Sequence, residues 1–391
     1  MQRPQSMERS LLLLMAVQLT TGFRGGVISP ILSLFIRRQG MSIGQVGLIG
    51  TASILGWLIF EPLSGVVADR IRKKWMIVFA IVGSTLIYAA YPLVSRFEHF
   101  LVLYFLMSSV MSAYAISVKA LTAELLPREN RGKAYGRYLS VISFGGVVAP
   151  MVGGWVTENM GYSVPFYLAS GIGLVTLSAV LLMRYDDKPL GAAAPRGGSI
   201  RELLTSALMS IFLARGMFIF NFMFTSNFLP IYLHESPRFQ ATETQIGAFQ
   251  TLFRLATAGG QAALGDVMDR LRSRRVMVGS VSLLGLSYLA LASGGGLPLL
   301  FVLGCVQGVL TAAADMSMMI HLMSVMPPGR TGMVMGLYSE SENVGGLVAN
   351  PALGFIYENI GGGASVLALV AVLLATSMAS ALMIRDAEER N

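Results

Sequence analysis

The sequence predicts an all-α membrane protein, with twelve transmembrane helices in two pseudo-symmetric six-helix bundles. Three observations predict this fold class: the composition, the recurrence of long apolar runs, and an internal repeat at a spacing of 200 residues. Of the 391 residues, 54% are hydrophobic and only 13% are charged. A soluble domain carries about 25% charged residues. The chain therefore lacks the polar surface that a water-soluble protein needs.

The apolar runs are each long enough to cross the ~30 Å hydrocarbon core of a bilayer as a helix. They must be helical, because a helix satisfies its own backbone groups in lipid without closing a barrel. We interpret the first run as a span, since it is longer than the apolar part of a signal peptide and has no small-residue cleavage site. The predicted spans are 11–36, 43–66, 75–94, 99–123, 134–157, 164–184, 206–233, 244–266, 276–294, 297–321, 332–356 and 363–384.

The internal repeat divides the chain into two similar halves. Gly65–Lys74 returns as Gly265–Arg274, and Glu158–Gly161 returns as Glu358–Gly361. A single duplication at about half the chain length predicts two structurally similar bundles rather than many short repeats. The expected domains are an N-terminal bundle over 1–184, a Pro- and Gly-rich cytoplasmic linker over 185–205, and a C-terminal bundle over 206–391.

Basic residues set the orientation of the predicted spans. With both termini in the cytoplasm, most Lys and Arg residues fall on the inside, and only Arg37, Arg38, Arg96 and Arg238 fall on the outside. This bias follows the positive-inside rule and accounts for the net charge of +8. It predicts a protein of the plasma membrane and no binding of nucleic acid. The one cysteine, Cys305, lies inside a span, so neither a disulfide framework nor a cysteine metal site is expected.

Two inter-span motifs indicate a family. Gly65-x-x-x-Asp69-Arg70-x-x-Lys73-Lys74 lies between spans 2 and 3, and Glu124-Leu-Leu-Pro-Arg-Glu-Asn-Arg-Gly lies between spans 4 and 5. Together with the topology, they resemble the major facilitator superfamily over the whole chain, although Arg72 stands where that family usually has glycine. The resemblance implies alternating access and a cytoplasmic gate. Its expected residues are Gly65, Asp69, Arg70, Lys73, Glu124, Gly265, Asp269 and Arg270.

Span 5 carries a second signature. Gly145-x-x-x-Ala149-Pro150-x-x-Gly153-Gly154 resembles the antiporter motif of drug:proton exchangers, with Ala149 in place of a glycine. Small residues at this spacing also serve ordinary close packing of helices, and the arginine that such antiporters carry in span 4 is absent. The signature favours proton-coupled export over import.

Charged residues inside the spans are the candidate binding groups, because each is costly to place in hydrocarbon. We expect Arg24, Arg254, Asp315 and Asn221 to contact the substrate. The alternative for the two arginines is a structural ion pair, with Asp315 or a glutamate as partner. Lys119 and Arg215 lie closer to the cytoplasm, and their long side chains are expected to reach the membrane surface. The further charges inside the spans are Glu61, Glu340 and Glu342.

Glu61, Glu340 and Glu342 are the candidates for proton coupling. If span 2 packs on span 11, Glu61 meets Glu340, and repulsion between the two carboxylates favours uptake of a proton. The repeat has Gln261 in place of Glu61 and Ser140 in place of Glu340, so the pair occurs at one of the two equivalent positions. Glu342 is two residues from Glu340 and is expected to point to the other side of the helix.

The sequence therefore predicts a secondary transporter that moves a small organic solute, with proton-coupled efflux as the preferred mode. The alternatives are uptake of an organic anion, with Arg24 and Arg254 as counter-charges, and a non-transporting sensor on the same scaffold. No enzyme activity and no cofactor are expected, because the chain has no nucleotide-binding loop, H-E-x-x-H or G-x-S-x-G motif. The expected partners are the solute, protons and the lipid bilayer, and the functional form is expected to be a monomer.

Overall fold

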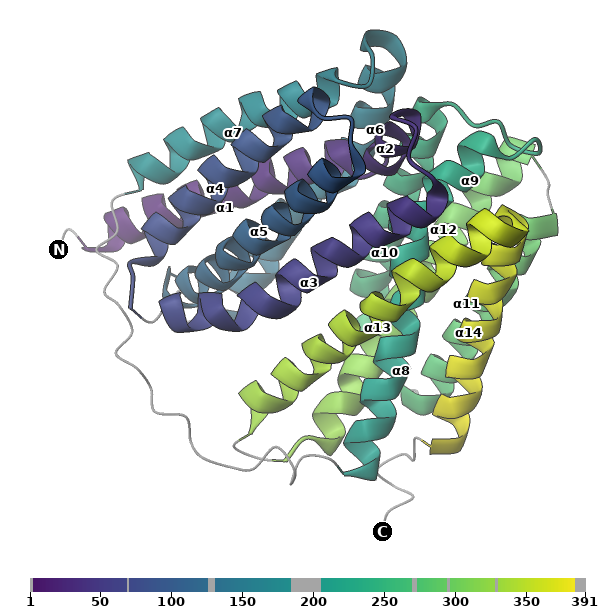
Figure 1. Ribbon diagram of the computed structural model, residues 1–391. Helices are drawn as coiled ribbons and strands as arrows, with labels where there is room; N and C mark the ends of the chain where they lie inside the picture. Colours follow the sequence, from purple (N-terminus) through teal and green to yellow (C-terminus); the bar gives the residue numbers. More distant parts are fainter. Residues whose placement is uncertain are drawn as a thin grey trace. The chain divides into compact units, whose positions relative to one another are not determined.

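The computed structural model describes residues 3–68, 70–125, 131–183, 205–268, 273–293, 296–327 and 330–383. Within these ranges the chain is helical and has no strand (Figure 1). In the N-terminal half the helices are α1 (Arg3–Ile28), α2 (Leu32–Arg38), α3 (Ile43–Ala68), α4 (Lys73–Ala90), α5 (Phe97–Leu125), α6 (Arg131–Met160) and α7 (Val164–Leu182). In the C-terminal half they are α8 (Ser206–Met223), α9 (Leu229–Glu235), α10 (Glu243–Met268), α11 (Ser273–Ser293), α12 (Gly296–Val325), α13 (Thr331–Ile360) and α14 (Gly362–Met383).

Two predicted spans are interrupted in the structure. Span 1 consists of α1 and α2, which are separated at Pro30 because proline cannot donate the backbone hydrogen bond that a continuous helix needs. Span 7 consists of α8 and α9, joined by a π-helical turn over Phe224–Phe228. Nine of the described helical segments are long and apolar enough to cross a membrane. The remaining three predicted spans are helical as α6, α10 and α13. The all-α prediction is confirmed, and the number of spans stays a prediction.

The helices form two compact units, each described by itself. Unit 1 comprises Met1–Gly40, Ala52–Pro195 and Glu243–Gly247. Unit 2 comprises Met41–Thr51, Arg196–Thr242 and Ala248–Asn391. Each unit therefore includes a short segment from the other half of the sequence, at the first turns of α3 or α10.

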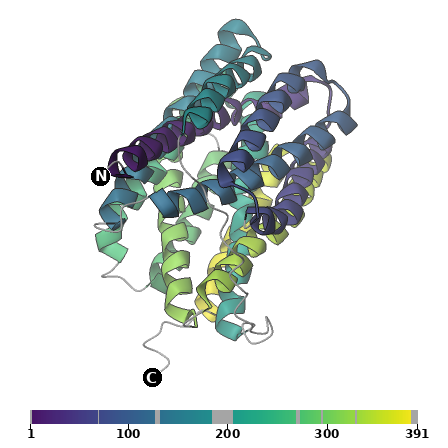
Figure 2. The same cartoon turned by 90° about the vertical axis from the view of Figure 1, so that its left-hand side faces the viewer.

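The internal packing of the two units follows the sequence repeat. In unit 1, α1 packs on α6 and α7, and α4 packs on α5 and α7. In unit 2, α8 packs on α13 and α14, and α11 packs on α12 and α14. Figure 2 shows the helices from a second side. These pairs are the ones that a shift of 200 residues interconverts, so the packing confirms the prediction of two similar halves.

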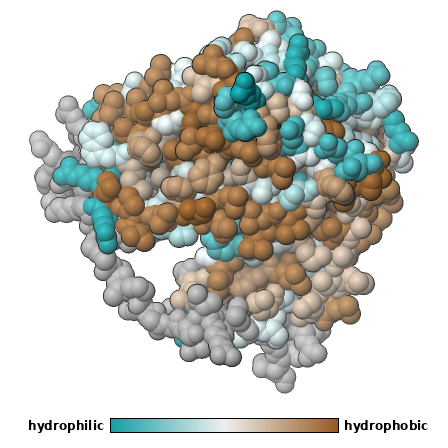
Figure 3. Space-filling view, in the orientation of Figure 1, coloured by the Kyte–Doolittle hydropathy of each residue, from teal (hydrophilic) through white to brown (hydrophobic). Residues whose placement is uncertain are grey.

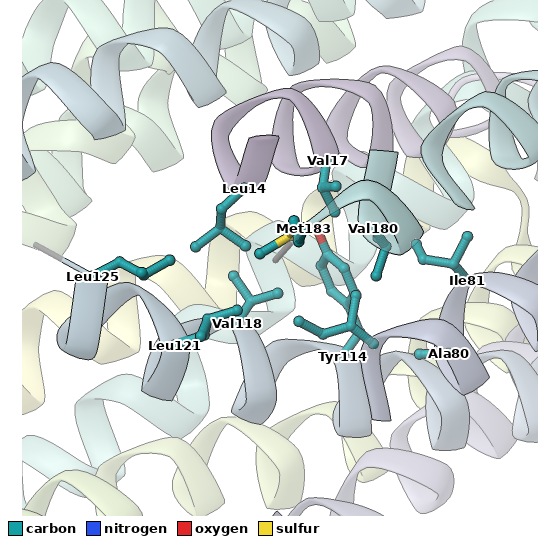
Figure 4. Packing of buried hydrophobic residues seen from close by; sticks show 11 residues of the cluster. Leu14, Val17, Ala80, Ile81, Tyr114, Val118, Leu121, Leu125, Val180 and Met183 are labelled. Atoms are coloured by element: carbon teal, nitrogen blue, oxygen red, sulfur yellow. The ribbon is translucent and has the colours of Figure 1, made fainter. Parts of the chain in front are cut away.

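The core of unit 1 is a cluster of apolar side chains between α1, α4, α5 and α7 (Figure 4). Leu14, Ile77, Leu121 and Val180 are buried in it, and the hydroxyl of Tyr114 donates to Gln18 at its edge. Outside the core, large apolar residues are exposed on the helices, and Figure 3 shows such a surface in brown. An apolar exterior over this many helices is expected of a protein whose solvent is lipid.

Two glutamates related by the repeat cap helix N-termini. In unit 2, one carboxylate oxygen of Glu358 accepts hydrogen bonds from the Ser42 hydroxyl at 2.9 Å and the Gly44 amide at 2.6 Å, at the start of α3. In unit 1, Glu158 accepts one from the Thr244 amide at 3.1 Å, at the start of α10. A carboxylate stabilises a helix N-terminus because the first amides have no partner in the helix and the helix dipole is positive there.

The turn between α6 and α7 carries a further polar contact in unit 1. The Tyr162 hydroxyl donates to Glu243, and the guanidinium of Arg38 lies 4.6 Å from the centre of the Tyr162 ring. Burial and the hydrogen bond to Glu243 raise the pKa of Tyr162 above its ordinary value, against the opposing effect of Arg38. The phenol therefore stays a hydrogen-bond donor at physiological pH.

Candidate functional site

A group of three charged side chains lies inside unit 2. Arg215 of α8 donates through Nε to Glu342 of α13 at 2.8 Å, and through Nη1 to Asp315 of α12. Both contacts are ion pairs. The structure thus brings together three helices that are far apart in sequence around one guanidinium. We call Arg215, Asp315 and Glu342 the charged triad.

The charged triad lies about a third of the way along the membrane-spanning helices. Arg215 is nine residues after the start of α8, Asp315 ten residues before the end of α12, and Glu342 eleven residues after the start of α13. In the predicted topology these three helix ends lie on the same side, because the chain crosses between them an even number of times. At 1.5 Å per residue, each group lies roughly 15 Å from its helix end, whereas α12 and α13 are each roughly 45 Å long.

Aromatic rings and partial access to solvent complete the surroundings of the charged triad. The guanidinium carbon of Arg215 lies 5.2 Å from the centre of the Tyr338 ring and 5.9 Å from that of Phe218. The side chains of Arg215, Asp315 and Glu342 are 16%, 33% and 31% exposed. Two carboxylates that are neither fully buried nor fully hydrated can contact a cationic solute.

The predicted substrate residue Asn221 is enclosed in a polar network within unit 2. Its Oδ1 accepts from the Tyr288 hydroxyl at 2.7 Å, and its Nδ2 donates to Thr311 at 3.4 Å. Thr225, in the π-helical turn, lies 2.9 Å from the Tyr288 hydroxyl. Asn221 is 2% exposed. Because the Tyr288 hydroxyl contacts both Asn221 and Thr225, this network stabilises the π-helical turn that interrupts span 7. π-helical turns of this kind are frequent at functional sites.

The three glutamates proposed for proton coupling have different surroundings. Glu342 belongs to the charged triad, whereas Glu340 accepts a hydrogen bond from Asn343 at 3.2 Å. The two acids of α13 thus have separate partners, as their two-residue spacing predicts. Glu61 is a half-buried residue of α3 in unit 1, and Glu340 belongs to unit 2. Their mutual approach stays a prediction.

Arg24 is enclosed within unit 1 and is only 1% exposed. One terminal nitrogen donates to the hydroxyls of Ser84 at 3.2 Å and Thr85 at 3.3 Å, and the guanidinium lies 5.1 Å from the Tyr88 ring centre. Nε and Nη1 have no hydrogen-bond partner among the described residues. Asp315, one of the partners considered for Arg24, forms its ion pair with Arg215. Arg254 lies half-buried on α10.

The predicted gate residues are only partly within the described ranges. Asp69, Asp269 and Arg270 lie outside them, as does the side chain of Glu124. A side chain at Gly65 would meet no described atom within 4 Å. Gly265 is in α10. Lys73 is fully buried and Arg70 is exposed.

The small residues of the span 5 signature form the contact between α6 and α1. A methyl group at Gly145 would collide with the backbone carbonyl of Leu19, and one at Gly153 with that of Val27. Ala149 lies against Gly26 and is fully buried. Small side chains therefore let the backbones of α1 and α6 approach closely, which is the packing interpretation of the signature.

Arg215 is the residue whose partners the sequence interpretation missed. It lies a few turns from the start of α8, as expected, but its guanidinium pairs with Asp315 and Glu342. The available signal was the equal distance of the three residues from their helix ends. That signal becomes readable only when the helix bounds are known to within a turn, because one turn changes the depth by 5.4 Å.

The described residues form apolar helices in two similarly packed units, with ionisable groups inside the helices, and this architecture is typical of membrane transporters. The family model of the Major Facilitator Superfamily matches residues 14–239 and 211–391. The chain belongs to the major facilitator superfamily, which confirms the resemblance of its motifs and the expectation of a transporter rather than an enzyme.

Relatives of known sequence include efflux proteins. The multi-drug resistance efflux pump PmrA of Streptococcus pneumoniae is 22% identical over 66% of this chain and 66% of its own length. The quinolone resistance protein NorA of Staphylococcus aureus is 27% identical over 42% of each chain. An uncharacterized transporter of this superfamily from Methanocaldococcus jannaschii is 24% identical over 91% of this chain and 93% of its own. The chain thus spans just under two thirds of PmrA.

Solved structures share the fold. The nucleoside transporter NupG superposes with a TM-score of 0.80 at 14% identity, over 96% of this chain and 98% of NupG. The human organic anion transporter MFSD10 superposes with a TM-score of 0.67 at 18% identity, over 97% and 100% of the two chains. At these identities the likeness concerns the fold and not the solute.

Proposed function

We propose that this chain exports a small organic cation in exchange for protons, by alternating access in the plasma membrane. The observation that carries the proposal is the charged triad, in which two carboxylates share one guanidinium inside the helices of unit 2. The names of PmrA and NorA, an efflux pump and a resistance protein, support export as the direction. The bias of basic residues supports an orientation with both termini in the cytoplasm.

The charge balance of the triad gives the exchange a physical basis. With both acids ionised, the group carries one net negative charge, which is costly in a medium of low dielectric. A proton on Asp315 or Glu342 neutralises that charge and leaves one matched ion pair with Arg215. A cationic solute beside the same carboxylates neutralises it equally well. Proton and cation therefore compete for one negative charge, which is the requirement for antiport.

The alternative of anion uptake depended on Arg24 and Arg254 as counter-charges. The enclosed position of Arg24, with bonds to Ser84 and Thr85, favours a structural role for that residue. The cationic solute is therefore the better-supported cargo. The predicted Glu61–Glu340 pair remains part of the proposal as a second place where protons act, tested by Glu61→Gln and Glu340→Gln.

The test is transport of ethidium by the full chain in proteoliposomes with an imposed pH gradient. Ethidium is expected to move against its own gradient, and collapse of the pH gradient by nigericin is expected to stop it. Asp315→Asn and Glu342→Gln are expected to lose gradient-driven transport. Glu98→Gln, an exposed acid at the start of α5, is the matched control and is expected to transport normally. Transport of organic anions, or ethidium transport unaffected by nigericin, would overturn the proposal.

A further inference from the structure

A groove on unit 1 lies between α3, α4 and α5, three helices that run beside one another (Figure 1). Its volume is about 570 Å³. Leu63 and Val67 of α3 and Trp75 and Phe79 of α4 form its walls, and Ile71 lies at its end beside the basic loop. Leu63, Trp75 and Phe79 are 51%, 55% and 63% exposed, so the walls face the surroundings of the protein. In a membrane those surroundings are lipid.

The groove is hollow because its floor consists of small residues. Ser64 of α3 and Ser109 and Ala113 of α5 line it. Both hydroxyls are already satisfied within the protein: Ser64 Oγ lies 3.2 Å from Ser112 Oγ, and Ser109 Oγ donates to the Phe105 carbonyl at 2.7 Å. The floor therefore offers no unmet hydrogen bond to an occupant. An apolar groove with a satisfied floor suits methylene groups and not a polar solute.

Two of the basic side chains near the end of the groove are exposed, and two are engaged within the protein. Four basic residues, Arg70, Arg72, Lys73 and Lys74, lie in the loop after α3 and at the start of α4. Lys74 donates to the carbonyls of Leu181 at 2.9 Å and Met183 at 2.7 Å, at the end of α7. Lys73 is fully buried. Arg70 and Arg72 are both exposed, and they flank Ile71 of the groove. Arginine binds phosphate in a planar, two-pronged geometry.

We propose that this groove is a binding site for an anionic phospholipid, with one acyl chain between α3, α4 and α5 and the phosphate at Arg70 and Arg72. Trp75 is half exposed at the first turn of α4, and tryptophan there favours the interface between headgroups and hydrocarbon. The apolar walls and the two exposed arginines at the end of the groove match the two parts of such a lipid. Basic residues at the end of transmembrane helices commonly select anionic headgroups. This site is separate from the charged triad, which belongs to unit 2.

Tryptophan fluorescence provides a direct test, because the chain has only three tryptophans, Trp57, Trp75 and Trp155. In a Trp57→Phe, Trp155→Phe protein, Trp75 is the sole reporter of the groove. Reconstituted in bilayers, its emission is expected to be quenched more strongly by brominated phosphatidylglycerol than by brominated phosphatidylcholine. The expected ratio of relative binding constants is roughly thirtyfold, from about 1 kcal/mol for each of two arginines near the headgroups. Arg70→Gln with Arg72→Gln is expected to bring that ratio close to one.

The matched control is a Trp57→Phe, Trp75→Phe protein that keeps Trp155, which is 49% exposed on α6 away from the groove. It is expected to show no preference between the two lipids. Ala113→Phe fills the floor and is expected to weaken quenching of Trp75 by both lipids. Equal quenching of Trp75 by the two lipids in the protein with both arginines would overturn the proposal, and so would a preference that survives Arg70→Gln with Arg72→Gln.

Discussion

Two buried arginines in this chain have opposite electrostatic surroundings. Arg215 faces two carboxylates, whereas Arg24 faces hydroxyls and the ring of Tyr88, with no carboxylate among its described contacts. A buried ion pair that loses one partner leaves an uncompensated charge, but loss of an unpaired buried charge removes a desolvation penalty. The same substitution should therefore affect stability differently at the two positions.

We expect Arg215→Met to lower the melting temperature of the detergent-solubilised protein, at a cost of about 2 kcal/mol, because Asp315 and Glu342 lose their shared cation. This loss of stability is smaller than that for a fully buried ion pair, because both acids are about one-third exposed and water screens their charges. Arg24→Met is the matched control and is expected to leave the melting temperature within a few degrees of the unmodified protein. Equal destabilisation by both substitutions would contradict this account of Arg24.

The two acids of α13 allow a second comparison at the residue scale. Glu342 contacts Arg215, and Glu340 contacts Asn343. In an Arg215→Met background, Glu342→Gln is expected to restore part of the lost melting temperature, since it removes one of the carboxylates left without a cation. Glu340→Gln in that background should restore nothing, because Glu340 does not share the guanidinium. If Glu340→Gln also restored the melting temperature, Glu340 would interact electrostatically with Arg215 as the acids of the triad do.

At the scale of elements, glycine positions decide how closely the helices of unit 1 pack. Gly153 lies where α6 meets the backbone of α1 at Val27, whereas Gly171 of α7 has open space around it. Gly153→Ala is expected to destabilise the protein by about 1–3 kcal/mol, because the added methyl forces the backbones apart. Gly171→Ala is expected to be neutral or slightly stabilising, since alanine favours the helix. Thermal unfolding followed by circular dichroism separates the two results.

The glutamate cap on α3 is a second element-scale feature that mutation can test. Glu358→Ala removes the acceptor for Ser42 and Gly44, and we expect a loss of about 1 kcal/mol, as for other N-terminal caps. Glu358→Gln keeps an acceptor oxygen and should lose less. Asn359→Ala, at the next position, removes only a bond to its own helix at Phe355 and serves as control. A larger effect at Asn359 than at Glu358 would refute the role of the cap.

At the scale of the whole molecule, the orientation of the chain can be tested at two exposed arginines. In a Cys305→Ser protein, which has no other cysteine, Arg72→Cys and Arg96→Cys each introduce one thiol. The proposed topology predicts that a membrane-impermeant maleimide added to intact cells labels the protein with Arg96→Cys and not that with Arg72→Cys. The reverse pattern would place the termini outside and reverse the direction proposed for transport.

The sequence predicts the helices and their equivalence well, because each of these predictions depends on many residues at once. Apolar length predicts the helices, and the repeat predicts which helices are equivalent. The site was only partly predictable, because contacts depend on the rotation of each helix about its axis. Asp315 and Glu342 were recognised from their cost in hydrocarbon, but Arg215 was not recognised as their partner. Asn221 was expected to contact the substrate, and its hydrogen bonds to Tyr288 and Thr311 could not be predicted, because they require neighbours that are distant in sequence.

The composition of the two units has a consequence for the ancestry of the chain. Unit 2 includes Met41–Thr51 of the N-terminal half, and unit 1 includes Glu243–Gly247 of the C-terminal half. Either half made alone would therefore lack the segment that the other half contributes to its unit. Its own contributed segment, Met41–Thr51 or Glu243–Gly247, would have no unit to pack into. A half-length ancestor is expected to have existed as a pair of identical chains that each completed the other. We expect that fusion of two copies of such a gene made this exchange of segments intramolecular.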